Sequence, residues 1–258
     1  MTTPRTERYD AGFYADQVDD SARAAAVILP IVFGPLAPER VIDIGCGQGA
    51  WLAAAGALGA TTLTGLDGAW VERDKLRDRR ITFLPTDLAG AFPPPTRHDL
   101  CISVEVAEHL PASRAEGFVA SCCAAADAVL FSAAAPLQGG TEHVNEQRAS
   151  QWAARFAAQG FDAFDLVRAR VWDDARVAWW YRQNVIVYAR RDTAAHRALA
   201  AVPAVPPPFD LIHPEGFEAK LRFLLDQNAS YRTRLDQPTW RQAFGTILRA
   251  LRPTRPSP

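Results

Sequence analysis

Short apolar runs alternate with longer helix-forming segments along the first half of the chain. Runs of this length, bounded by glycine or polar residues, are typical of buried strands, which we expect at 40–44, 61–66, 81–84, 99–104 and 128–133. The expected helices are 50–58, 71–79 and 113–125, after an Ala-rich first helix that ends or kinks at Pro30. Strands alternating with helices predict an α/β fold, with a parallel sheet covered on both faces.

The pattern changes after residue 134. Residues 135–147 are rich in glycine and polar side chains, which predicts a loop, and a helix at 150–159 follows and ends at Gly160. Residues 161–171 and 182–190 indicate two further strands, with only the Trp-rich stretch 172–181 between them. We therefore expect an antiparallel hairpin that closes one edge of the sheet.

The last part of the chain has a different composition. A Pro-rich stretch at 202–208 is typical of a linker, two helices are expected at 214–236 and 238–251, and the tail is expected to be disordered. We predict a domain over 1–201, with its N-terminal helix as a lid, and a helical extension over 202–258. Leu221, Leu224 and Leu225 form an apolar face that packs on the domain, covers the pocket or makes a homodimer.

Net charge, apolar stretches and cysteine spacing each disfavour certain classes of protein. The net charge of -1 shows no basic excess, which disfavours a nucleic-acid partner. No apolar stretch is long enough to span a membrane, and residues 1–10 lack the apolar core of a secretion signal. Four cysteines at spacings unlike CxxC predict reduced thiols rather than disulfides or zinc ligands. We expect a cytoplasmic protein.

The strongest motif lies where the first strand meets a helix. Gly45, Gly47 and Gly49 let the backbone turn sharply and approach a ligand, and the helix N-terminus behind them offers free N–H groups. Asp43 precedes this loop, and Asp67 ends the next strand, where a carboxylate accepts hydrogen bonds from both ribose hydroxyls. The spacing differs from GxGxxG, which weakens a dinucleotide interpretation.

On these residues the chain resembles the class I S-adenosylmethionine-dependent methyltransferases. Their first motif matches Asp43, Gly45, Gly47 and Gly49, their ribose-binding acid matches Asp67, and their adenine-reading acid matches Asp87. The resemblance covers about residues 20–190. It implies a Rossmann-like, seven-stranded, mostly parallel sheet with an antiparallel last strand. It also implies S-adenosylmethionine as cofactor, bound by Asp43, Gly45, Cys46, Gly47, Asp67, Gly68, Asp87, Leu88 and Val104.

Three further pieces, 138–146, 179–184 and 211–215, look like a bacterial subgroup found beside sugar or surface-glycan enzymes. This resemblance implies a small-molecule acceptor with a sugar or natural-product hydroxyl or carboxylate. A hydroxyl acceptor needs a base, and histidine is suited to this near neutral pH. His143 is the preferred base, with His109 and Glu105 as further catalytic candidates. The 172–181 stretch and Asn184 are candidates for lining the acceptor pocket.

Other functions stay open. Glu105, Glu108 and His109 form Glu-x-x-Glu-His, which resembles divalent-metal clusters of ubiquinone-pathway O-methyltransferases and of enzymes that methylate the terminal ribose of small RNAs. A metal there, completed by His143, would lower the pKa of the acceptor hydroxyl. Because Glu-His also occurs in relatives without metal, we assign no metal ligand. N-methylation is a further alternative. A non-enzymatic binding protein is disfavoured by the intact cofactor motif.

Overall fold

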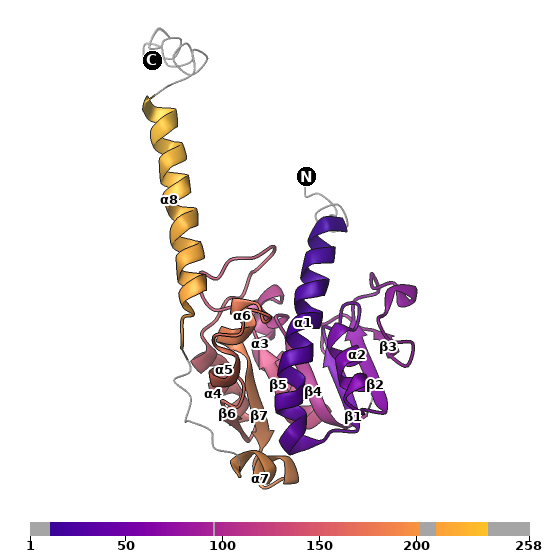
Figure 1. Cartoon of the computed structure of the whole chain (residues 1–258). Helices are drawn as coiled ribbons and strands as arrows, with labels where there is room; N and C mark the ends of the chain where they lie inside the picture. Colours follow the sequence, from indigo (N-terminus) through magenta and orange to yellow (C-terminus); the bar gives the residue numbers. More distant parts are fainter. Residues whose placement is uncertain (1–10, 95, 202–209, 237–258) are drawn as a thin grey trace, which may run out of the picture. The chain divides into compact units, whose positions relative to one another are not determined.

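The computed structural model describes residues 11–94, 96–201 and 210–236, with side chains placed from residue 20 to residue 231 (Figure 1). The chain divides into two units, Met1–His213 and Pro214–Pro258, which are described separately. The first unit holds a single seven-stranded sheet flanked by helices. Among the described residues, no helix has the length and apolarity needed to cross a membrane.

The sheet has the strand order β3-β2-β1-β4-β5-β7-β6. Its strands are β1 Arg40–Ile44, β2 Thr62–Asp67, β3 Thr82–Pro85, β4 His98–Val104, β5 Ala126–Ser132, β6 Phe161–Phe164 and β7 Ile186–Arg190. β7 is antiparallel to both of its neighbours, β5 and β6, and the other pairs are parallel. This confirms the expected fold. The strand order reverses between β1 and β4, and sheets of this kind bind ligands at the carboxyl ends of the strands beside such a point.

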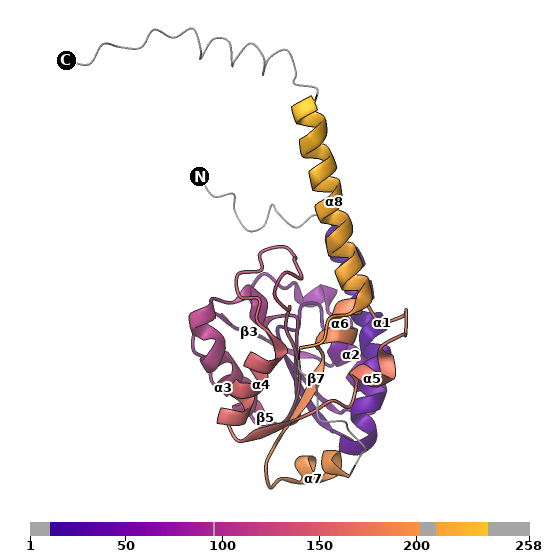
Figure 2. The same cartoon turned by 90° about the vertical axis from the view of Figure 1, so that its left-hand side faces the viewer.

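Helices cover both faces of the sheet (Figure 2). On one face, α1 Ala11–Leu36, α2 Ala50–Ala57 and α7 Ala194–Ala200 contribute to a hydrophobic cluster that includes Val41 of β1. On the other face, α3 Ala115–Ala125 and α4 Ala149–Ala158 pack around Ile42, the next residue along the strand. The alternation of β1 side chains between two buried layers explains why this strand is apolar throughout.

The sequence predicted a first helix that ends or kinks at Pro30, and the structure shows that it does not end there. α1 continues through Pro30 and Pro35 to Leu36. Proline cannot donate the helical hydrogen bond to the preceding turn, which weakens a helix on its own. Here Ile28, Leu29 and Val32 are fully buried around the proline, so tertiary packing holds the helix together. Whether the first turns of α1 act as a lid stays a prediction.

Two other expected elements were wrong. The helix at 71–79 is reduced to the 3-10 turn η2 Arg73–Lys75, because this segment has no buried stripe to pack against. The strand expected over 161–171 ends at Phe164, and two short helices follow, α5 Arg168–Val171 and α6 Trp179–Asn184. The strand expected over 182–190 begins only at Ile186, because residues 182–184 belong to α6. The remaining predicted strands and helices between β1 and α4 lie within two residues of their observed bounds.

Two more 3-10 turns, η3 Ala107–His109 and η4 Ala112–Arg114, lie between β4 and α3. The second unit contains α8 Pro214–Asp236, which coincides with the predicted helix. The predicted linker at 202–208, the helix at 238–251 and the tail lie outside the described residues.

Candidate active site

The β1–α2 loop is built from glycines in the left-handed region of backbone conformation. Gly45, Gly47 and Gly49 have φ angles of 91°, 50° and 77°. A Cβ at Gly45 would lie 2.3 Å from a methyl group of Val106, so no side chain fits there. A Cβ at Gly47 would have no neighbour within 4 Å, which leaves space for a ligand to approach the backbone. The loop thus fits the cradle that the sequence predicted.

Asp67 closes this loop from the end of β2. Its carboxylate accepts hydrogen bonds from the backbone N–H groups of Gly47, at 2.8 Å, and Gly68, at 2.7 Å. Burial raises the pKa of Asp67, and these two N–H groups oppose the shift. Each carboxylate oxygen keeps a further lone pair, so Asp67 can still accept hydrogen bonds from two ligand hydroxyls.

Asp43 and Cys46 lie in the same region. Asp43 is buried, and one of its carboxylate oxygens has no hydrogen-bond partner. Burial, and then the charge of Asp67, raise the pKa of Asp43 well above its ordinary value. The Cys46 thiol is buried against Gly65, and burial raises its pKa, so it is an inert packing group.

The remaining predicted cofactor residues follow β3 and β4. Asp87 is exposed and accepts a hydrogen bond from the Ala89 N–H at 3.0 Å, while Leu88 beside it is buried. Val104 is the last residue of β4. The sequence did not single out Trp70, whose ring covers Gly68 so closely that a Cβ there would lie 2.1 Å from it. All these residues lie at the carboxyl ends of β1 to β4.

Glu105 occupies a strained position directly after β4. Its φ angle of 55° is rare for a residue with a side chain. Its carboxylate accepts hydrogen bonds from the side-chain amides of Gln138, at 2.9 Å, and Asn184, at 3.2 Å. The structure therefore ties Glu105 to the 135–147 loop and to α6, a connection that the sequence did not indicate.

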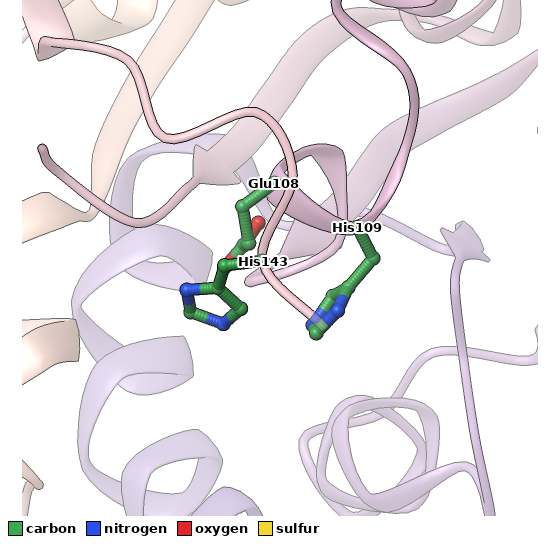
Figure 3. A group of neighbouring side chains, drawn as sticks. All are labelled: Glu108, His109 and His143. Atoms are coloured by element: carbon green, nitrogen blue, oxygen red, sulfur yellow. The ribbon is translucent and has the colours of Figure 1, made fainter. Parts of the chain in front are cut away.

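Glu108, His109 and His143 come together beside this network (Figure 3). One oxygen or nitrogen from each residue lies within 4.8 Å of the others, and the two imidazole rings meet edge to face at 4.9 Å. Glu108 is fully buried, and its carboxyl lies close to Glu105 and to the backbone of Ala134 without a well-formed hydrogen bond. Burial, and then the charge of Glu105, raise its pKa well above the ordinary range.

Hydrogen bonds hold the 135–147 loop against this cluster. The backbone carbonyl of Glu108 accepts hydrogen bonds from the N–H groups of Val144 and Asn145. The Asn145 side chain donates to the carbonyl of Ala107 at 3.1 Å. The Nδ1 atom of His143 lies 3.1 Å from a carboxylate oxygen of Glu146, and the His143 side chain is only 12% exposed.

The other histidines lie away from this cluster. His98 is buried between Thr96 and Thr64, and His196 contacts Asp162. His213 is buried with its Nε2 atom 2.9 Å from the carbonyl of Trp172. In the aromatic stretch, Tyr181 is buried against Trp51, whereas Trp179 and Trp180 are partly exposed.

Residues 14–132 match the model of a protein family described as "Methyltransferase domain". This part of the chain is similar to a methyltransferase domain. The glycine loop, Asp67 and the Glu105–His109 segment all lie within the matched range. The cluster is completed by His143, which comes from the loop beyond it.

Solved structures share the fold. A magnesium protoporphyrin IX methyltransferase from Synechocystis PCC 6803 is 18% identical, with a TM-score of 0.52 over 71% of this chain and 89% of its own. The methyltransferase domain of bacterial CtHen1-C is 18% identical, with a TM-score of 0.50 over 66% and 98%. An O-methyltransferase family protein from Burkholderia thailandensis is 14% identical, with a TM-score of 0.52 over 70% and 60%. No match was found among curated proteins.

Proposed function

We propose that this methyltransferase binds S-adenosylmethionine (SAM) and methylates a hydroxyl group of a small-molecule acceptor. The observation that carries this proposal is one arrangement at the carboxyl edge of the sheet. The open glycine loop follows β1, and Asp67, a carboxylate suited to binding ribose hydroxyls, ends β2. A pair of side chains, the imidazole of His143 and the carboxylate of Glu146, lies in the loop that follows β5. Two solved structures with this fold hold S-adenosylhomocysteine (SAH) or SAM.

The residues of the glycine loop fit the cofactor. Asp67 is placed to accept the ribose hydroxyls, and the open side of Gly47 admits the ligand to the backbone. The N-terminus of α2 offers N–H groups to a carboxylate. When bound, SAM supplies a methyl group on a positively charged sulfonium, so the chain mainly has to align the acceptor and exclude water.

We propose that His143 is the base that removes the proton from the acceptor hydroxyl. An ionised Glu146 only accepts hydrogen bonds, so Nδ1 of His143 carries the ring proton and Nε2 keeps the lone pair that removes a proton from a hydroxyl. His109, edge to face with this ring, packs against it. The carboxylate of Glu105 disfavours an acceptor carboxylate in the same place, because like charges repel.

The first test is calorimetric titration of SAH into the full chain and into Asp67→Ala. Removing two charge-assisted hydrogen bonds is expected to weaken SAH binding at least about tenfold. Asp74→Ala, an exposed carboxylate of η2, serves as the control and is expected to bind like the unmodified chain. Absence of SAH binding by folded, ligand-free protein would contradict the proposal.

A test of the acceptor chemistry follows. SAH release is measured with a panel of sugars, natural-product alcohols, phenols, carboxylates and amines. We expect turnover with hydroxyl acceptors and a loss of kcat by about a hundredfold or more in His143→Ala, since general-base catalysis contributes on that order. Turnover with amines or carboxylates alone, unaffected by His143→Ala, would contradict the assignment.

A second candidate is metal-assisted O-methylation at the same cluster. The observation that favours it is the buried carboxyl of Glu108, which lies within 4.8 Å of ligand atoms of two histidines, because a bound cation would stabilise the charge that burial disfavours. Glu108, His109 and His143 would hold a divalent cation, which would lower the pKa of the acceptor hydroxyl. Glu105 is engaged by Gln138 and Asn184, so the cluster differs from the four-residue pattern that the sequence suggested.

Metal titration separates the two candidates. The metal candidate predicts calorimetric binding of Mg²⁺ or Mn²⁺ to the chelator-treated chain that Glu108→Gln abolishes, and activity that chelation removes. The base candidate predicts no such binding and activity that survives the chelator. If an RNA is the acceptor, its binding to the chain is expected to weaken steeply with salt.

A further inference from the structure

The carboxylate of Glu146 organises the whole segment from residue 137 to residue 146. One oxygen accepts a hydrogen bond from the Leu137 N–H at 2.7 Å. The other accepts from the Gly139 N–H at 2.8 Å and contacts Nδ1 of His143 at 3.1 Å. Two backbone donors and one imidazole nitrogen, from three points of one loop, therefore converge on a single side chain, which is only 20% exposed.

This loop needs such an anchor because its backbone is strained. Leu137 and Glu142 have φ angles of 70° and 59°, a conformation that is unfavourable for residues with a Cβ. Gly139 and Gly140 also have positive φ angles, of 76° and 152°. Strain of this kind persists only where surrounding contacts over-determine the backbone. The hydrogen bonds to Glu146 supply those contacts.

Gly140 fixes the other side of the His143 ring. A Cβ at this position would lie 2.3 Å from both Cε1 and Nε2 of His143. The absence of a side chain is therefore what lets the ring occupy its place. His143 is held between a hydrogen bond at Nδ1 and a backbone that approaches its opposite edge.

We propose that Glu146 is a positioning residue, which sets the tautomer and orientation of His143, and that Gly140 keeps Nε2 of His143 open to the acceptor. This inference rests on the proposed function, in which His143 removes the proton of the acceptor. The hydrogen bond between Glu146 and His143 can be tested without knowing the acceptor. A carboxylate on one imidazole nitrogen fixes where the proton sits and thereby frees the other nitrogen.

The test reads the tautomer directly by long-range ¹H–¹⁵N correlation spectra of the full chain, labelled at histidine and kept in chelator at about pH 8, where imidazoles are mainly neutral. Comparison with His143→Gln assigns the His143 signals. We expect the Nδ1–H form in the unmodified chain and a shift toward the Nε2–H form in Glu146→Ala. Glu146→Asp, which restores a carboxylate, is expected to recover part of the Nδ1–H form.

Two controls separate positioning from general disruption. Glu116→Ala removes an exposed carboxylate on α3 and is expected to leave the His143 signals unchanged. Gly140→Ala is expected to displace them, whereas Gly160→Ala is not. Gly160 also has a positive φ, of 81° compared with 152° at Gly140, but a Cβ there would meet nothing within 4 Å, so this variant carries backbone strain without the steric contact.

SAH titration of the same samples keeps the two proposals apart. We expect SAH affinity within about twofold of the unmodified chain in Glu146→Ala and Gly140→Ala, because the glycine loop is untouched. If the unmodified chain binds no SAH, the proposed function fails whatever the spectra show. If it binds SAH but Glu146→Ala keeps the Nδ1–H form, or Gly160→Ala displaces the signals as much as Gly140→Ala, the positioning proposal is overturned.

Discussion

Asp43 shows how a predicted binding residue can lower stability. It is buried beside Asp67, and its pKa is raised first by burial and then by that neighbouring charge. A carboxyl whose pKa is raised in the folded state stabilises it fully only below the ordinary carboxyl pKa, and this contribution is lost as the pH rises through the folded-state pKa. At neutral pH, the buried carboxyl therefore makes the fold less stable than a side chain that does not titrate would.

We accordingly expect Asp43→Asn to raise the Tm of the ligand-free protein at neutral and alkaline pH. If the amide raises the free energy of unfolding by about 1 kcal/mol, the Tm rises by about 2–4 °C in a chain of this size. The difference is expected to shrink as the pH falls and both side chains become neutral. Thermal melts across pH check this, with Asp74→Asn as an exposed control. A Tm that falls in Asp43→Asn at high pH would contradict the prediction.

Single residues differ in how far the sequence reveals them. Asp43, the three glycines and Asp67 form one local motif, and the structure brings Asp67 and Gly47 together by a hydrogen bond. The network around Glu105 could not be predicted, because its partner Asn184 lies 79 positions away and depends on how α6 packs. Short motifs predict local backbone geometry, whereas contacts between residues far apart in the sequence can be identified only from the three-dimensional structure.

At the scale of elements, a buried ion pair links β6 to the helices behind it. Arg168 of α5 is 1% exposed and contacts Asp165 at 2.7 Å, and it also donates to the backbone carbonyl of Gln183 in α6. A buried guanidinium needs its partner, since an uncompensated charge in the interior is strongly unfavourable. This pair explains why the chain leaves the strand after Phe164 instead of extending to residue 171.

We expect Asp165→Ala to destabilise the fold by about 3–5 kcal/mol, because it leaves the Arg168 charge buried without its carboxylate. This corresponds to a fall in Tm of about 10 °C, measured by calorimetry or circular dichroism. Asp174→Ala breaks the exposed pair with Arg176 and is expected to leave the Tm unchanged. Equal effects of the two variants would show that the buried pair is not a structural link.

Elements with a strong apolar pattern were predicted well, and short ones were not. The buried strands β1, β2, β4 and β5 show their character in any window of a few residues, because both of their faces are covered. α5 and α6 span too few residues to show a helical period, and their polar side chains are buried through specific hydrogen bonds. Their formation depends on tertiary contacts that no local pattern contains.

At the scale of the whole molecule, the structure divides the chain after His213 rather than at the Pro-rich segment. Residues 210–213 belong to the first unit through specific contacts. The Asp210 carboxylate accepts hydrogen bonds from the N–H and hydroxyl of Ser150. His213 is buried, its N–H donates to the Gln183 side chain, and its ring packs against Trp172. Gln183 in turn donates to Asn184 of the Glu105 network.

Two truncations test which boundary delimits the domain. A chain ending after His213 keeps these contacts and is expected to match the full chain in SAH affinity and in the Tm of its main transition. A chain ending after Ala201 loses the hydrogen bonds of Asp210 and His213, worth about 2–4 kcal/mol at roughly 1 kcal/mol each. Its Tm is therefore expected to be about 5–10 °C lower. If both truncated chains melt alike, residues 210–213 contribute nothing to the domain, and the boundary at 201 that the sequence suggested is the right one.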